Sequence, residues 1–339
     1  MRTSFRIVLF IALLTTIVPG AAFPADKEQS GTVVLKMHIT PFLSYAPLFI
    51  AEDEGYFREQ GLTVDFIKGV PASQTILLLV RGELDVWGGG ISSGLLNSLA
   101  REGNFRIVAG KGYIAPESCT YLSLVASPGF LEEVEKGGLS VMAGRKIATV
   151  PAGMQAYYVS RILERAGLGL KDVEMVNMPN PARMQAVTEG SLDLVVTGEP
   201  WLTRILRTGK AVQWMPGEKV IPGYQSGYLG FGERLRQEEP AVGRRFMVAY
   251  LKGVRQYKMG KTERNLEIVA RHTGQDKDLL EEACWPAFRE NGMIDTGSVL
   301  DFQDWALARG TADKALKVED FWDPSFVEHA RRMLGNPGN

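Results

Sequence analysis

Arg81-Gly82-Glu83-Leu84-Asp85-Val86-Trp87-Gly88-Gly89-Gly90 has a counterpart later in the chain, Glu189-Gly190-Ser191-Leu192-Asp193-Leu194-Val195-Val196-Thr197-Gly198. Both stretches read G-x-L-D, and residue 82 corresponds to residue 190, so the copies lie 108 residues apart. Each copy follows an apolar run, so we expect its first Gly to end a helix in the left-handed conformation that a Cβ disfavours. The Leu then enters the core and the Asp holds the turn. A short strand follows and ends in Gly, where a ligand can approach the backbone closely.

The elements before each copy also correspond. Residues 35–41 and 145–151 each predict a strand that a Pro ends, and a helix follows each strand. Further strands are predicted at 63–67 and 173–176, in each case after a Gly-Leu pair. Strands that alternate with helices form parallel sheets with right-handed crossovers, and ligands bind beyond the carboxyl ends of such strands. One G-x-L-D is common in α/β proteins, but a repeat in register with its flanking elements predicts two similar α/β lobes.

Length and composition are those of an ordinary globular protein with more than one domain. The chain has 339 residues, 45% of them hydrophobic and 23% charged, and a formal net charge of −1. This balance excludes the basic footprint of a nucleic-acid-binding protein. The chain has three His and two Cys, without metal-ligand spacing. Cys119 and Cys284 are either two free thiols or one long-range disulfide, and the sequence leaves both open.

The N-terminus has the pattern of a secretory signal peptide. Arg2 and Arg6 precede the apolar run Ile7–Val18, and small residues follow it up to residue 22. The apolar run is short for a membrane span, although a retained anchor is the alternative. The cleavage region contains no Cys for a lipid anchor. We expect residues 1–25 to be signal peptide and leader, and the mature protein to be periplasmic.

Several motifs resemble one family of periplasmic solute-binding proteins, whose members serve ABC importers of aliphatic sulfonates, taurine, nitrate and the thiamine pyrimidine precursor. These motifs cover nearly all of the mature chain. They are Tyr45–Ala51, Glu54–Phe57, Gly61-Leu62, Gly82–Asp85, Gly144–Gly153, Thr197–Trp201, Phe246–Tyr250 after Pro240, and Val318–Phe321. The motifs are specific for the fold and uninformative about the ligand.

The resemblance implies a type II periplasmic-binding-protein fold. In that fold each lobe is a mainly parallel sheet flanked by helices, and the ligand cleft lies between the lobes. We expect lobe 1 to comprise residues 31–118 with 225–339, and lobe 2 to comprise residues 119–224. The chain would cross between the lobes near Tyr121 and again near Gly227, where small residues suit a hinge.

The candidate ligand-binding residues lie at strand ends and turns of the two lobes. They are Phe42, Ser44, Tyr45, Gly90, Ile91, Ser92, Gly153, Met154, Gln155, Glu199 and Trp201. Ser92 and Ser93 can cap the next helix, which would leave nearby backbone N–H groups for an anionic or carbonyl group of the ligand. Residues 152–155 offer the same arrangement in the second lobe. A plain N-cap without a ligand is the alternative in both places.

Four aromatic residues are candidates for flat apolar walls of the site. They are Phe42, Tyr45, Trp87 and Trp201. Core packing is the alternative for each of them. His38 stands at a strand end and is a candidate base or ligand-binding group, although packing is the more common role of a lone strand His. Ser44 is also a reasonable N-cap for the helix expected at 48–54.

Glu199 corresponds to Ile91 of the first lobe, so the repeat places its carboxylate at the end of a strand. Two roles remain open for it. It pairs with an amine or ring N–H of the ligand and disfavours a multiply charged anion, or it braces the turn before Pro200.

No catalytic motif is present, so we expect a binding protein and not an enzyme. The chain lacks a P-loop, H-E-x-x-H and C-x-x-C, and neither a cofactor nor a metal is expected. The resemblance implies a monomer that captures a small organic molecule and delivers it to a membrane ABC permease. The alternatives are an enzyme on the same fold, of the pyrimidine-precursor synthase or menaquinone-pathway lyase type, and a ligand-sensing module.

Export of the chain gives the first testable prediction. The protein recovered from the periplasm should begin near Phe23 or Asp26, because the small residues before these positions suit signal peptidase. N-terminal sequencing of the periplasmic fraction measures this. An intact Met1 in a soluble cytoplasmic pool would contradict export and favour the enzyme alternative.

Overall fold

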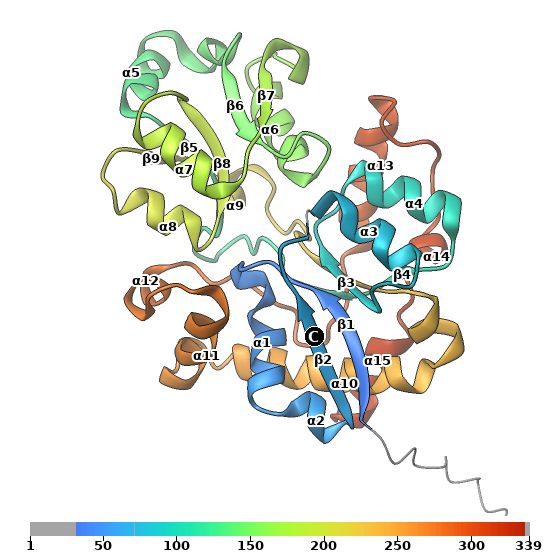
Figure 1. Ribbon diagram of the computed structural model, residues 1–339. Coiled ribbons are helices and arrows are strands. Elements are labelled where there is room, and N and C mark those ends of the chain that lie inside the picture. Colours follow the sequence, from blue (N-terminus) through green and yellow to red (C-terminus); the bar gives the residue numbers. More distant parts are fainter. Residues whose placement is uncertain (1–31, 71, 336–339) are drawn as a thin grey trace, which may run out of the picture. The chain divides into compact units, whose positions relative to one another are not determined.

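The computed structural model describes residues 32–70 and 72–335. The chain from residue 32 onward forms one compact unit, and it contains two five-stranded sheets (Figure 1). The strands are β1 (Val33–His38), β2 (Leu62–Ile67), β3 (Val86–Gly89), β4 (Arg106–Gly110), β5 (Leu122–Ala126), β6 (Lys146–Thr149), β7 (Glu174–Asn177), β8 (Leu194–Gly198), β9 (Val212–Pro216) and β10 (Tyr228–Phe231).

The two sheets have the same internal order. The first sheet is β2-β1-β3-β10-β4 and the second is β7-β6-β8-β5-β9. In each sheet the fourth strand in this order, β10 or β5, is antiparallel to both of its neighbours. The other pairs are parallel, for example β1 with β2 and β6 with β7. The predicted α/β fold of two lobes, each with a mainly parallel sheet, is confirmed.

The chain passes between the sheets twice. It leaves the first sheet after β4 and enters the second at β5, and it returns between β9 and β10. The first crossing, predicted near Tyr121, therefore leads directly into β5, an antiparallel member of the second sheet. The lobe boundaries at residues 118 and 224 stay predictions.

Helices flank both sheets. They are α1 (Ala46–Asp53), α2 (Tyr56–Glu59), α3 (Ala72–Val80), α4 (Ser93–Glu102), α5 (Pro128–Gly137), α6 (Met154–Glu164), α7 (Asn180–Thr188), α8 (Trp201–Leu206), α9 (Gly217–Val220), α10 (Pro240–Tyr257), α11 (Glu263–Thr273), α12 (Lys277–Glu282), α13 (Thr296–Ala308), α14 (Val318–Phe321) and α15 (Ser325–Met333). Short 3₁₀ turns lie at Leu43–Tyr45 (η1), Gly138–Met142 (η2) and Leu170–Asp172 (η3), and a π-helical turn (η4) lies at Arg234–Glu238.

The G-x-L-D repeat has the local structure that the sequence predicts. Gly82 and Gly190 have φ angles of 71° and 76°, the left-handed region that glycine enters without a steric penalty. In the first copy, Asp85 Oδ2 accepts a hydrogen bond of 2.8 Å from the backbone N of Lys36 on β1. Asp85 Oδ1 also pairs with Arg234 at 3.1 Å. The carboxylate thus holds the start of β3 against its neighbouring strand.

The second Asp does the same for β8 with different partners. Asp193 Oδ1 accepts a hydrogen bond of 2.7 Å from Ser127 Oγ, and Oδ2 pairs with Arg145 at 3.0 Å. Ser127 directly follows β5, the neighbour of β8 in the second sheet. Each Asp therefore fixes the register of a central strand, and each of these strands leads to the region where the sequence predicts a ligand.

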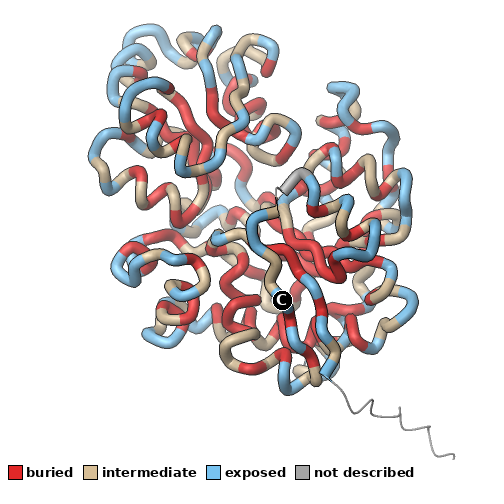
Figure 2. Tube along the Cα trace, viewed as in Figure 1, coloured by how far each residue is buried: buried red, intermediate tan, exposed pale blue. Residues whose placement is uncertain are grey.

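The core runs along the strands of both sheets, and exposed residues cover the outer helices (Figure 2). The longest helix, α10, packs against α1 and α15. Its Phe246, Tyr250 and Val254 are fully buried, so this face of the helix belongs to the core. Tyr250 also donates a hydrogen bond of 2.6 Å to the carbonyl of Gly110 at the end of β4. The α10 helix therefore supports the strand end that leads into the first crossing.

Cys119 and Cys284 form a disulfide, which decides between the two states that the sequence leaves open. Their Cα atoms lie 5.6 Å apart, and 165 residues separate them in the chain. The bond ties the first crossing segment to the loop after α12. No cysteine is free among the residues that the structure describes.

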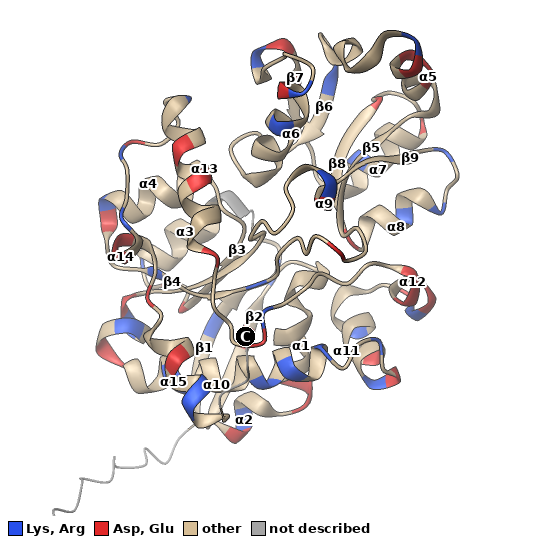
Figure 3. Ribbon diagram, turned by 180° about the vertical axis from the view of Figure 1, so that it is seen from behind, with Lys and Arg blue, Asp and Glu red and all other residues tan. Residues whose placement is uncertain are grey.

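The predicted signal peptide and leader lie outside the described residues. Within the described ranges, no helix is both long and apolar enough to cross a membrane. Acidic and basic residues are interspersed over the helices, for example on α2 and α11 (Figure 3).

Candidate functional site

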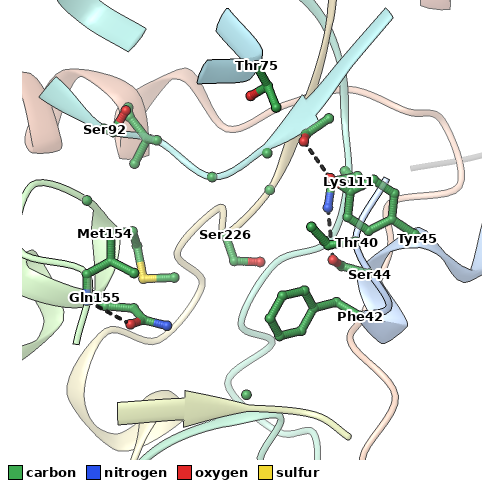
Figure 4. A pocket seen from close by; sticks show the side chains of 18 of the residues that line it. Thr40, Phe42, Ser44, Tyr45, Thr75, Ser92, Lys111, Met154, Gln155 and Ser226 are labelled. Atoms are coloured by element: carbon green, nitrogen blue, oxygen red, sulfur yellow. Dashed lines mark hydrogen bonds between the residues drawn. The ribbon is translucent and has the colours of Figure 1, made fainter. Parts of the chain in front are cut away.

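A cavity of about 510 Å³ lies at the carboxyl ends of β1, β3 and β8. Its remaining walls come from the loop before α6 and from the two crossing segments at Tyr121 and Ser226. All but one of the predicted ligand residues line it: Phe42, Ser44, Tyr45, Gly90, Ile91, Ser92, Gly153, Met154, Gln155 and Glu199. Residues from both lobes thus line one partly open cavity (Figure 4).

Two backbone hydrogen bonds join the lobes at the cavity wall. Ser93 N donates to the carbonyl of Ala152 at 3.0 Å, and Met154 N donates to the carbonyl of Ile91 at 3.1 Å. Ser92 and Gly153 form the antiparallel bridge between these bonds. We call this pair of hydrogen bonds the interlobe bridge.

The interlobe bridge corrects one expectation from the sequence. The sequence predicts that the N–H groups of Ser93 and Met154 face a ligand. Instead, each of them donates to a backbone carbonyl of the other lobe. Ser92 caps α4 as predicted, since its Oγ accepts from Leu95 N at 3.1 Å. The two helix starts therefore join the lobes at the cavity wall, and their N–H groups already have backbone acceptors in this structure.

Glu199 braces the turn after β8. Its Oε2 accepts from Thr203 N at 3.1 Å, and its Oε1 accepts from Thr203 Oγ1 at 2.8 Å and from Cys284 N at 3.1 Å. The side chain is 5% exposed. Burial raises the pKa of this carboxyl, and the hydrogen bonds from Thr203 and Cys284 oppose that shift. Of the two roles left open by the sequence, the contacts favour bracing, and they connect β8 to the segment that carries the disulfide.

Trp201 lies away from the cavity, contrary to the prediction. It is the first residue of α8, which packs against α7. Its ring contacts Arg204, whose Cζ lies 5.4 Å from the ring centroid, and both border a separate shallow hollow beside Met184. Glu199 is the last residue of this turn that lines the cavity, and Trp201 at the start of α8 lines the other hollow instead.

Lys111 is a cavity residue that the sequence analysis missed. It follows β4, its side chain is 3% exposed, and its Nζ donates to Ser44 Oγ at 2.8 Å. The same Nζ lies 3.8 Å from the centroid of the Tyr45 ring. Burial lowers the pKa of Lys111 to about 7. A lone Lys directly after the apolar run Ile107–Gly110, at the end of a strand, is the signal that could have identified it.

The contact with Lys111 also corrects the predicted role of Ser44. Ser44 does not cap α1, which begins at Ala46 with Tyr45 as N-cap and without a side-chain cap. The Ser44 hydroxyl instead accepts the hydrogen bond from Lys111. Tyr45 donates to the carbonyl of Gly88 at the end of β3, so its ring is fixed in the cavity wall.

His38 is buried at the end of β1 and lines the same cavity. Its ring nitrogens make no hydrogen bond of normal geometry to a described residue. Burial and, to a smaller extent, the charge of Lys111 lower the pKa of His38, while the Val70 backbone opposes the shift. The imidazole is therefore neutral at neutral pH, and it adds a polar group to the wall without adding a charge.

Gln155 is held in one orientation on the second-lobe side. Its Oε1 accepts from Val150 N at 3.1 Å and from Arg183 Nη1 at 2.9 Å. Arg183 is itself buried and also donates to the carbonyl of Val196 at 2.6 Å. With its oxygen fixed, Gln155 presents its amide N–H₂ as the available donor on the side opposite Lys111 and Ser44 (Figure 4). The cavity is thus an apolar space with a few fixed polar groups, which is typical of a small-molecule site.

Sequence comparisons connect the chain to known proteins. Residues 43–259 match the family model described as NMT1/THI5 like. Over 214 residues the chain is 25% identical to the bicarbonate-binding protein CmpA of Synechococcus elongatus, an alignment that takes in 56% of this chain and 45% of CmpA. The chain therefore spans about half the length of the curated relatives it matches.

Solved structures share the fold. The periplasmic nitrate-binding protein NrtA from Synechocystis gives a TM-score of 0.73 at 14% identity, over 91% of this chain and 90% of NrtA. The ligand-binding component of an ABC-type import system from Staphylococcus aureus gives 0.72 at 16% identity, over 88% of this chain and 99% of that one. The desulfurization enzyme DszB gives 0.64 at 14% identity, over 89% and 99%. At these identities the likeness establishes the fold alone.

Replacing Glu199 by Gln tests its bracing role. The amide places a donor where Thr203 N or Cys284 N now donates, so the free energy of unfolding should fall by about 1.5–3 kcal/mol, the range for hydrogen bonds to charged groups. Urea unfolding measures the change, and Glu135→Gln on an exposed part of α5 is the control. An unchanged unfolding midpoint would contradict the bracing role.

Replacing Lys111 by Met should stabilise the ligand-free protein. Burial of the ammonium lowers its pKa from 10.5 to about 7, so below pH 7 the native state carries the full cost of burying the charge. We expect a gain of about 2–4 kcal/mol at pH 6. The gain should shrink as pH rises from 7 towards 10.5, because the native wild-type Lys then loses its proton while the unfolded Lys keeps it. Unfolding at pH 6 and pH 9 measures this, and a gain that is equal at both pH values would contradict it.

Proposed function

The chain belongs to the NMT1/THI5-like family, and on this premise we propose that it is the solute-binding component of an ABC importer. It captures a small organic molecule in the cavity between its lobes and delivers it to the membrane permease. The observation that carries the proposal is the cavity itself, because its walls come from matching strand ends of both lobes and the interlobe bridge joins the lobes at its wall.

The geometry supports a closing mechanism. A ligand held between the lobes contacts both, so it favours the state in which the interlobe bridge is formed. The two crossing segments, which precede β5 and β10, are the places where backbone rotation would separate the lobes. Breaking two backbone hydrogen bonds at the rim, which water can replace, has a modest net cost of about 1–3 kcal/mol. Opening is therefore accessible without ligand and is opposed by ligand.

The comparisons support this function at a coarse level. CmpA, NrtA and the Staphylococcus aureus import component are binding proteins by their names, and the chain shares the family or the fold with them. We extend to this chain a periplasmic location and a permease partner. The predicted signal peptide supports the location.

An enzyme is the second candidate, because DszB has the same fold and because Ser44 Oγ lies 2.8 Å from a lysine with a lowered pKa. Such a pair can act as nucleophile and base. An acyl-transfer site also needs backbone donors beside the nucleophile. The two N–H groups that follow Ser44 are both used within the turn, Tyr45 N by the carbonyl of Phe42 and Ala46 N by that of Leu43. This arrangement favours binding over catalysis.

The proposed function is tested on the protein as purified from its periplasm. Native mass spectrometry should show a bound small molecule at one copy per chain. After extraction and refilling, that molecule should raise the melting temperature by mass action, with about 2.7 kcal/mol of stabilisation at a hundredfold excess over Kd. It should be recovered chemically unchanged after prolonged incubation. Recovery of an altered molecule would overturn the transport function and favour the enzyme.

An engineered disulfide tests the closing mechanism. Ser92 and Gly153 are the non-hydrogen-bonded pair of the interlobe bridge, and Cα atoms in such a pair lie about 4.5 Å apart, within the range of a disulfide. The oxidised double variant Ser92→Cys, Gly153→Cys should bind and release the extracted molecule at least tenfold more slowly than the wild type. The two single variants are the controls, and equal exchange rates in oxidised double variant and controls would contradict closure at this point.

A further inference from the structure

The cavity contains a buried cation for which the described part of the chain supplies no anion. In the described part of the chain no carboxylate lies within 4.0 Å of Lys111 Nζ, whose contacts are the neutral hydroxyl of Ser44 and the face of the Tyr45 ring. A hydroxyl and a ring face only partly replace the water that the ammonium loses. A buried charge without a partner lowers the stability of the folded protein. Its position in a ligand cavity therefore points to an anionic partner group on the ligand.

The other titratable groups of the cavity do not provide that partner. They are His38 from β1, Tyr45 from η1, Tyr121 from the first crossing segment and Glu199 at the end of β8. His38 is neutral at neutral pH because burial lowers its pKa, and burial raises the pKa of both tyrosines. Glu199 has its oxygens occupied by Thr203 and Cys284. One uncompensated positive charge therefore faces the cavity.

The rest of the cavity is apolar and too large for an inorganic anion alone. Phe42, Trp87, Ile91 and Met154 line it together with glycine backbone. A volume of about 510 Å³ is within the range of sites for organic ligands, whereas a water molecule takes about 30 Å³. An anion the size of a few waters would leave most of the apolar wall without contacts. The ligand therefore has an apolar body as well as a charged group.

We propose that the corner formed by Lys111 and Ser44 binds the single anionic group of an organic acid, whose apolar body lies against Phe42, Ile91 and Met154. The inference rests on the proposed function of the cavity as a ligand site and specifies the chemical class of its ligand. The anionic group accepts from the ammonium of Lys111 and, on the opposite side, the amide of Gln155 donates to a polar atom of the body. A second negative charge finds no second cation and is excluded.

Binding of such a ligand is coupled to uptake of a proton. In the empty cavity the pKa of Lys111 is about 7, so a large fraction of the molecules lacks the ammonium at physiological pH. An anion raises this pKa because it favours the charged form. Affinity should therefore be nearly constant below pH 7 and fall as pH rises above it, by up to tenfold for each further unit.

Matched charged and neutral probes test the subsite. The anions phenylacetate and benzenesulfonate are compared with phenylacetamide and benzenesulfonamide, which have the same bodies without the charge. Calorimetry at pH 6.5 and 8.5, in two buffers of different ionisation enthalpy, gives Kd and the number of protons taken up. The test variant is Lys111→Met, which should fold stably because it removes a buried charge. The control is Lys146→Met, which changes an exposed lysine paired with Glu174.

The expected result is an at least tenfold preference of the wild type for an anion over its neutral counterpart, with proton uptake and weaker binding at pH 8.5. Lys111→Met should abolish the preference, and Lys146→Met should keep it. The carboxylate and sulfonate arms distinguish the two acid types. Lack of anion preference in both arms, or a preference that survives Lys111→Met, would overturn the subsite.

Failure of the subsite and failure of the proposed function are distinguishable. A natural solute that binds one to one and lacks an acidic group would overturn the subsite and leave the importer function intact. An acid that binds through Lys111 but is recovered chemically altered would overturn the importer function and leave the subsite intact.

Discussion

The interlobe bridge is the contact on which the site depends. Ser93 N with Ala152 O and Met154 N with Ile91 O join two loops that follow strands of different sheets. Because both bonds use backbone atoms, almost any side chain is compatible with them, and the neighbouring side chains are free to shape the cavity. At Gly153 a Cβ would lie 3.4 Å from the Ile91 carbonyl oxygen, which is an ordinary van der Waals distance, so the bridge is compatible with a small side chain there. The bridge holds the loops after these strands together at the wall of one cavity.

Hydrogen bonds to neighbouring residues hold most of the polar side chains of the cavity wall in place. Arg183 and Val150 hold the oxygen of Gln155, Thr203 and Cys284 hold the carboxylate of Glu199, and Gly88 holds the hydroxyl of Tyr45. A group whose hydrogen-bonding partner is already in place does not need to reorganise when a ligand arrives. Most of the wall is therefore preorganised by these contacts.

Lys111 differs from these groups because its charge is not satisfied by the protein. Glu199 and Lys111 are both buried. The Glu199 carboxylate accepts hydrogen bonds from three donors, whereas the Lys111 ammonium contacts one neutral acceptor and the face of a ring. Burial acts on both, raising the pKa of the acid and lowering that of the base. Because of this difference in partners, Glu199 has a structural role, whereas Lys111 can still pair with a charged group of a ligand.

The fold class, the internal repeat and the approximate place of the site are predictable from the sequence alone. These follow from local rules: Gly82 and Gly190 end helices, Asp85 and Asp193 hold the turns, and alternating strands and helices place strand ends on one edge of each sheet. Which polar atoms remain available to a ligand depends on the three-dimensional packing of the chain. The pairing of Ser93 with Ala152, the bracing of Glu199, the position of Trp201 beyond the cavity and the disulfide all depend on partners far away in the chain. The sequence shows only that Lys111 follows an apolar strand, and its burial arises because the segments around Ser44 and Tyr45 fold over it. Local sequence periodicity does not predict such long-range contacts, because each of them depends on how the whole lobes pack.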